Sequence, residues 1–324
     1  MLVSVLLFAV GLVLLIKGGD WFVDGATGIA KRFNLPDIVV GATVVSIGTT
    51  LPEVMVSTTG ALAGSGAMAY GNAIGSIICN TALIAAISIT CNPGPVNVKS
   101  MKTPAIFFFC SAAMYCLAAY GLGTFPRWLG FVMLTVFVIY MVMTVRNGLQ
   151  NPDSTEEEEE GEQKERKLWQ ELLLLVIGAA VIAVGADLLV DHGQIIAIGL
   201  GVPETVVALL FVALGTSLPE LVTTITSLKK GRASLGVGNV IGANVFNLVL
   251  VSGVAVSLAP FDVPVENTLL NTGLNLSLVF DIPVMLLVMS LMIFPALAKK
   301  KLGRWQGIVL LGIYVAFCIC QFTL

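Results

Sequence analysis

Apolar stretches of about 20 residues follow one another along almost the whole chain, separated by short segments rich in glycine, proline or charge. Each stretch is long enough to cross a hydrocarbon core roughly 30 Å thick, and the alternating pattern of membrane β-barrels is absent. The pattern therefore predicts an all-α membrane protein. It predicts ten transmembrane helices, near residues 2–32, 37–63, 69–91, 103–121, 126–146, 169–196, 203–229, 235–259, 277–297 and 305–323.

Composition agrees with this interpretation. Of the 324 residues, 57% are hydrophobic and 11% are charged, which excludes a soluble globular domain of this length. One segment differs, because residues 147–168 contain a run of five glutamates and too few apolar residues to build a core. We expect three parts: a first transmembrane repeat (1–146), an acidic linker (147–168) and a second transmembrane repeat (169–324).

Basic residues predict the orientation of the chain. Lysine and arginine cluster after the odd-numbered spans, and Arg127 is the exception in the even-numbered gaps. Cytoplasmic loops carry the excess of positive charge in membrane proteins. We therefore expect a multi-pass protein of the cell membrane with a cytoplasmic linker and both termini outside the cytoplasm.

The two halves are copies of each other. An alignment that places Asp20 on Asp187 also places Glu53 on Glu220 and Asn80 on Asn247, without a gap; it is called here the repeat alignment. Because each half has an odd number of spans, the second half must be inverted relative to the first. Two inverted five-helix repeats, with broken helices at the bilayer midplane, are typical of secondary transporters.

The repeated motif places a glutamate in each of two apolar spans. It reads GTTLPE at 48–53 and GTSLPE at 215–220. A charged residue at bilayer depth costs on the order of 2.5–3.5 kcal/mol, so each glutamate needs a functional reason. The glycine and proline of each motif weaken the helix and release backbone carbonyls. Hydroxyl groups lie at the same bend, on Thr49, Thr50, Thr216 and Ser217.

A second pair of segments, GNAIGSIICN and GNVIGANVFN, adds polar side chains. Asn72, Ser76 and Asn80 recur every four residues and form one face of a helix, and Asn239, Ala243 and Asn247 repeat the spacing. Hydrogen bonding between helices is the alternative role for such residues. With the two glutamates they make a set of oxygen ligands, which hard cations such as Ca²⁺ and Na⁺ prefer.

These motifs resemble the paired alpha repeats of the prokaryotic, ten-helix sodium/calcium exchangers in the calcium/cation antiporter superfamily. The resemblance covers nearly the whole chain. It implies that the cation ligands are the side chains of Thr49, Thr50, Glu53, Ser76, Asn80, Thr216, Ser217, Glu220 and Asn247, with the backbone carbonyls of Ser46 and Ala213.

Two positions depart from the family pattern. Many prokaryotic members have an aspartate at the position of Asn247 and a serine at the position of Ala243. The two remaining carboxylates neutralise one Ca²⁺ or two Na⁺. The missing hydroxyl at Ala243 removes one oxygen ligand. The sequence therefore does not decide whether that sodium subsite is present, or what the stoichiometry of exchange is. Potassium dependence goes with acids at the asparagine positions in this superfamily, so we do not expect it.

The expected function is antiport of Na⁺ against Ca²⁺ by alternating access, with spans one and six moving across a fixed core. We expect no enzymatic activity, no cofactor, no nucleic-acid partner and a monomer whose partners are the transported Na⁺ and Ca²⁺ and membrane lipids. The six cysteines lack the spacing of a zinc site or a disulfide framework.

Three alternatives remain from the sequence. A Ca²⁺/H⁺ antiporter would protonate the same glutamates, although such exchangers usually carry an extra acid in the GNA segment. A passive cation channel would need no counter-ion, and an intramembrane hydrolase would need a catalytic constellation that the sequence lacks. For Asp20, Asp24, Asp187 and Asp191 we expect interfacial or helix-end roles, and for His192 an interfacial position rather than a pH sensor.

Overall fold

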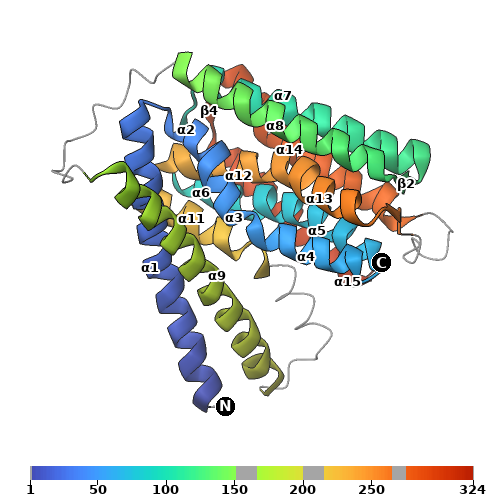
Figure 1. Ribbon diagram of the computed structural model, residues 1–324, viewed down its shortest axis with the longest axis horizontal. Helices are drawn as coiled ribbons and strands as arrows, with labels where there is room; N and C mark the ends of the chain where they lie inside the picture. Colours follow the sequence, from blue (N-terminus) through green and yellow to red (C-terminus); the bar gives the residue numbers. More distant parts are fainter. Residues whose placement is uncertain (1, 151–165, 200–214, 265–274, 324) are drawn as a thin grey trace.

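The computed structural model describes residues 2–150, 166–199, 215–264 and 275–323, which are almost entirely helical (Figure 1). In the first half the helices are α1 (Leu2–Phe33), α2 (Asp37–Val40), η1 (Gly41–Val45), α3 (Ser46–Thr49), α4 (Leu51–Leu62), α5 (Gly66–Cys79), η2 (Asn80–Ala85), α6 (Ala86–Cys91), α7 (Val98–Cys116), η3 (Leu117–Leu122) and α8 (Arg127–Gln150). The η elements are π-helical turns. In the second half they are α9 (Leu168–Gly199), α11 (Leu218–Lys229), α12 (Ala233–Phe246), η4 (Asn247–Val251), α13 (Ser252–Leu258), η6 (Ser277–Asp281), α14 (Ile282–Lys299) and α15 (Arg304–Thr323).

The helices confirm a multi-pass membrane protein. Within the described ranges, eight helices are long and apolar enough to span a membrane, and the pair Asp37–Thr49 and Leu51–Leu62, bent by 46°, makes a ninth. The bend lies at the GTTLPE motif, where the sequence predicts a broken helix. The predicted span at 203–229 is described only from Gly215 onward, so its first half lies outside the described residues.

Among the described residues, four short strands depart from the otherwise helical structure. β1 (Gly94–Pro95) pairs antiparallel with β4 (Lys301–Leu302), and β2 (Thr124–Phe125) pairs antiparallel with β3 (Phe261–Asp262). Each pair joins a loop of the first half to a loop of the second half. They are very short and arise where two loops meet, so hydropathy does not predict them.

The two halves have the same local structure at matching positions. The repeat alignment places both ends of α4 on those of α11, and both ends of α5 on those of α12. The turns that follow α4 and α11 each contain a glycine with positive φ, +85° at Gly64 and +71° at Gly231. Side chains rarely adopt this conformation, so the glycines allow the same tight turn in both halves.

Helices α1 and α9 pack against each other and lie side by side (Figure 1). Glycines permit the approach: a Cβ atom at Gly11 would lie 2.9 Å from the Gly185 carbonyl oxygen, and one at Gly185 would lie 2.9 Å from the Gly11 carbonyl oxygen. A Cβ atom at Gly18 would lie 3.1 Å from the Gly178 carbonyl oxygen. The repeat alignment converts the Gly11–Gly185 pair into the Gly18–Gly178 pair. The contact between α1 and α9 therefore has approximate two-fold symmetry.

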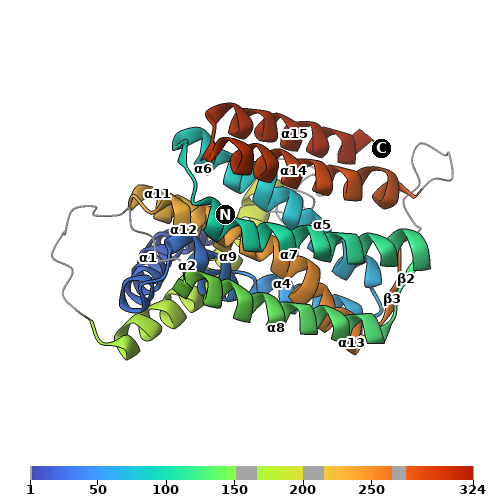
Figure 2. The same cartoon turned by 90° about the horizontal axis from the view of Figure 1, so that it is seen from above.

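The centre of the molecule is formed by the helices that carry the GN motifs. In Gly66–Cys91 and Ala233–Leu258 the apolar windows are 72% and 83% buried, whereas the windows of the other six long helices described are at most 39% buried. Figure 2 shows α14 and α15 along one side of this centre and α8 along the opposite side. The polar stripes predicted from the sequence therefore lie inside protein rather than against lipid.

Candidate cation site

Both motif glutamates lie at the start of a helix in the interior. Glu53 is in the first turn of α4 and Glu220 is in the first turn of α11, and both residues are 0% exposed. Each follows a proline, which the first turn of a helix tolerates because its missing N–H would have no helical partner there. The positive end of each helix dipole therefore faces a carboxylate, as the broken helices of transporters arrange it.

The asparagines at the ends of the GN motifs lie at a matching irregularity. Helix α5 changes to a π-helical turn at Asn80, and α12 does so at Asn247. Such turns occur frequently at functional sites because they re-aim side chains within a helix. Both residues are 0% exposed, and neither the amide nitrogen nor the amide oxygen of either has a hydrogen-bond partner among the described residues.

Hydrogen bonds connect each GT motif to the GN motif of the other half. Thr49 Oγ1 donates to Asn239 Oδ1 at 3.1 Å, and Thr216 Oγ1 donates to Asn72 Oδ1 at 3.4 Å. The repeat alignment converts the first contact into the second. These reciprocal bonds place the two half-motifs in one polar centre.

Asn72 and Asn239 also hold the backbone of the motifs. Asn72 Nδ2 donates to the Glu53 carbonyl oxygen at 3.2 Å and to Ser57 Oγ at 2.8 Å. Ser46 Oγ donates to the Asn239 carbonyl oxygen at 2.9 Å. The sequence pattern placed both asparagines on the polar faces and left open a role in hydrogen bonding between helices. It did not select these partners, because Ser46, Glu53 and Ser57 lie on other helices.

Several buried acceptors lack a partner in the described part of the chain. They are both carboxylate oxygens of Glu53, Oε2 of Glu220 and Oγ of Ser217. Glu220 Oε1 accepts a long hydrogen bond of 3.5 Å from Thr50 Oγ1. Buried carboxylates without compensation are costly, so oxygens in this state are suited to a cation.

The other predicted ligands vary in their surroundings. Ser76 is buried at 3% exposure on α5, one turn before Asn80. The Ser46 carbonyl oxygen accepts the Thr50 N–H at 3.0 Å, which leaves it one lone pair. Ala243 is fully buried one turn before Asn247. The predicted carbonyl ligand at Ala213 lies outside the described residues.

The donor set is mainly neutral. Within the described ranges, no group of three or more His, Cys, Asp and Glu side chains is gathered in a metal-binding arrangement. A cation held between the motifs would therefore meet two carboxylates together with amide and hydroxyl oxygens. This set favours Ca²⁺ or Na⁺ over transition metals, which prefer imidazole and thiolate.

A cavity of about 940 Å³ reaches the motifs from one side. It lies between α9 and the α3–α4 segment, and its lining includes Pro52 and Pro219, the residues that precede the two glutamates, as well as Thr216. Asp187 and Asp191 also line it, from α9. The adjacent His192 is not among the lining residues.

Comparison with known proteins identifies the family. The family model described as sodium/calcium exchanger protein matches residues 3–146 and 171–323. The chain belongs to the sodium/calcium exchanger family. The match is interrupted at the acidic segment between the two halves and covers almost everything else.

Relatives match the chain over nearly its full length. It is 34% identical to the membrane protein MJ0091 of Methanocaldococcus jannaschii, covering 95% of this chain and 94% of that protein. It is 30% identical to the sodium/calcium exchanger MaX1 of Methanosarcina acetivorans, covering 99% of both. A solved structure of the sodium-calcium exchanger NCX_Mj superposes with a TM-score of 0.77 at 33% identity, covering 97% of each chain. The named exchangers are transporters rather than enzymes.

Proposed function

We propose that this family member exchanges Na⁺ for Ca²⁺ across the membrane, with Glu53 and Glu220 as ligands shared by both ions. The observation that carries the proposal is the pair of fully buried glutamates at matching helix starts, three of whose four carboxylate oxygens have no partner in the described structure. An exchanger couples two fluxes when both ions compete for the same ligands. Two buried negative charges match one Ca²⁺ or two Na⁺.

The proposed ligand set includes the polar residues around the carboxylates. Asn80 and Asn247 supply amide oxygens, and the hydroxyl groups come from Thr49, Thr50, Ser76, Thr216 and Ser217. Backbone carbonyls at Ser46 and Ala213 complete it. Because Ala243 has no hydroxyl, one ligand fewer is present in the second half than in the first, and Na⁺ at that position would be held more weakly.

Alternating access follows from the symmetry of the halves. We propose ten spans in two inverted repeats, 1–146 and 169–324, joined by a cytoplasmic linker, with both termini outside. The reciprocal contacts of Gly11 with Gly185 and of Thr49 with Asn239 support this arrangement. The α1–α9 pair would slide across the central helices, and the cavity beside α9 would be the path to one side of the membrane.

Calcium uptake into proteoliposomes under separate ion gradients tests the proposal. We expect an outward Na⁺ gradient to drive Ca²⁺ uptake at neutral pH, and a K⁺ gradient to drive none. Uptake driven by a pH gradient in the absence of Na⁺ would instead establish a Ca²⁺/H⁺ antiporter. Ca²⁺ flux that needs no counter-ion would establish a channel, and either result would overturn Na⁺/Ca²⁺ exchange.

A further inference from the structure

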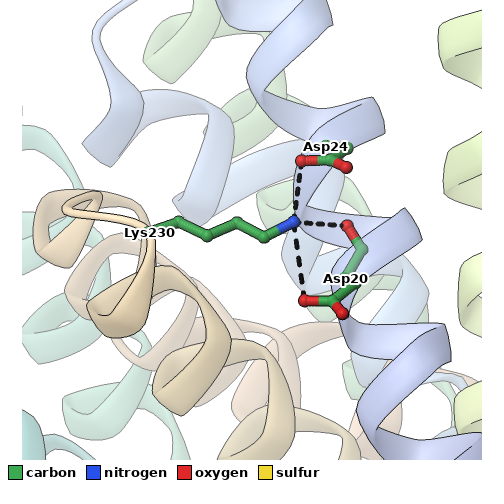
Figure 3. Close-up of polar contacts among 3 residues, drawn as sticks. All are labelled: Asp20, Asp24 and Lys230. Carbon is green, nitrogen blue, oxygen red and sulfur yellow. Dashed lines mark hydrogen bonds and ion pairs between the residues drawn. The ribbon is translucent and has the colours of Figure 1, made fainter. Parts of the chain in front are cut away.

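Lys230 forms a charged cluster with two aspartates of α1 (Figure 3). Its Nζ atom lies 2.7 Å from Asp24 Oδ1 and 3.6 Å from Asp20 Oδ1, and it donates to the Asp20 carbonyl oxygen at 2.8 Å. Lys230 directly follows α11, the helix that begins with the Glu220 motif. The cluster therefore ties the helix that carries a proposed ion ligand to the α1–α9 pair.

The cluster lies on the side of the molecule where α1 ends and α9 begins, called here the linker side. Arg32, near the end of α1, donates to the Arg166 carbonyl oxygen at 2.6 Å, just before α9. A Cβ atom at Gly25, next to Asp24, would lie 2.6 Å from the Glu171 carbonyl oxygen in the first turn of α9. The aspartates that line the cavity lie toward the other end of α9. The cluster and the cavity aspartates thus lie toward opposite ends of the α1–α9 pair.

A polar face of α11 connects Glu220 with Lys230. Thr223, Thr224 and Ser227 follow Glu220 at helical spacing, are at most 2% exposed, and have hydroxyl oxygens without a partner among the described residues. Buried hydroxyl groups without partners are unusual in a structural helix contact. Thr224 of this face packs on α12, against Gly236, whereas α1 covers the adjoining face of α11. A Cβ atom at Gly19 of α1 would lie 2.7 Å from Val222 Cγ1 and 2.8 Å from Thr226 Oγ1.

The arrangement is one-sided. The repeat alignment places Lys230 on Ala63 and the aspartates of α1 on Asp187 and Asp191 of α9. The described structure gives no ion pair to Asp187 or Asp191, whereas their counterparts on α1 bind Lys230. An inward and an outward conformation related by the repeat symmetry would therefore differ in energy by the contribution of this cluster.

We propose that Lys230, Asp20 and Asp24 form a latch that closes the linker side and holds the conformation in which the site is reached from the cavity. Release of the latch lets α1 leave Val222 and Thr226 of α11, which opens a path along α11 from Glu220 to the linker side. Lys230 is a positioning residue in this account, since it does not contact the ion. The proposal rests on the alternating access proposed above.

Thiol labelling of two single-cysteine reporters tests the latch. The natural cysteines are replaced, and cysteine is placed either at Thr226, which α1 covers at Gly19, or at Ala183, in the cavity lining. In detergent, a hydrophilic maleimide reaches both faces of the protein. We expect Lys230→Gln to raise the labelling rate at position 226 about twofold to fivefold and to lower the labelling rate at position 183, because partly exposed ion pairs contribute modestly.

Matched variants separate the latch from a general loss of charge or stability. Lys229→Gln removes the same charge from the exposed neighbouring residue and is expected to change neither rate. The double variant Asp20→Asn with Asp24→Asn should reproduce Lys230→Gln, and Lys230→Arg should retain the parent rates. Equal labelling at position 226 in Lys230→Gln and Lys229→Gln would overturn the proposal.

The labelling and uptake experiments distinguish failure of the latch proposal from failure of the Na⁺/Ca²⁺ exchange proposal. If labelling shifts as expected but a Na⁺ gradient drives no Ca²⁺ uptake, the latch stands and the proposed exchange falls. If uptake is driven by Na⁺ but labelling does not shift, the exchange stands and the latch falls.

Discussion

Replacing Glu53 with glutamine is expected to lower Na⁺-driven Ca²⁺ uptake by at least about a hundredfold, and Glu220→Gln is expected to do the same. Two unit charges 4 Å apart interact by roughly 4 kcal/mol at an effective dielectric constant of 20, which corresponds to about a thousandfold in affinity. Glutamine keeps the shape and removes the charge. Uptake into proteoliposomes, normalised to the amount of folded protein, measures the loss.

The matched control for this pair is Glu171→Gln. Glu171 is a buried glutamate of α9 at 6% exposure, and it packs over Gly28 of α1, away from the motifs. We expect this variant to retain exchange within the same order of magnitude. Retention of exchange in both Glu53→Gln and Glu220→Gln would show that the buried carboxylates are not the shared ligands.

A second large effect is expected from filling the cavity. Ala183 lies on α9 in the lining, facing the α3–α4 segment. An indole at this position has no room without occupying the path to the motifs, so Ala183→Trp should lower the exchange rate by at least about tenfold. Because the ligands are unchanged, equilibrium Ca²⁺ binding should be less affected than the rate. Stopped-flow uptake and equilibrium binding on the same preparation distinguish the two.

The neighbouring residue provides the control for this substitution. Val184 is 53% exposed and is not among the lining residues of the cavity. Val184→Trp therefore adds the same side chain to an outer surface of α9 and should leave the rate near that of the parent. A parent-like rate in Ala183→Trp would exclude the cavity as the ion path.

Much of the fold could be predicted because membrane insertion imposes strong rules. Hydropathy placed the ends of most described spans within a few residues of the helices, and proline and glycine in GTTLPE predicted the bend at the end of α3. The two glutamates of the candidate site could be predicted for the same reason. A glutamate in an apolar span is rare enough to be informative, and its repetition at the matching position of the second half is more so.

Contacts between the halves could not be predicted in the same way. Thr49 bonds to Asn239, far away in the sequence, and no local pattern selects that partner among several asparagines. Lys230 was visible only as a positive charge in a loop, which indicated orientation, whereas its contact with Asp20 and Asp24 depends on the position of α1 along α11. Hydropathy does not indicate where α1 lies along α11, because α1 would be equally apolar at any position along its neighbour.

Competition between the two ions for the purified protein tests the central claim most directly. Ca²⁺ binding is measured by titration at increasing Na⁺ concentration, with ionic strength kept constant by choline. Two carboxylates match one Ca²⁺ or two Na⁺. The account therefore predicts that the apparent Kd for Ca²⁺ rises with about the square of the Na⁺ concentration, once that concentration is high enough for Na⁺ to saturate the site. An apparent Kd that does not change with Na⁺ would contradict a shared site at Glu53 and Glu220.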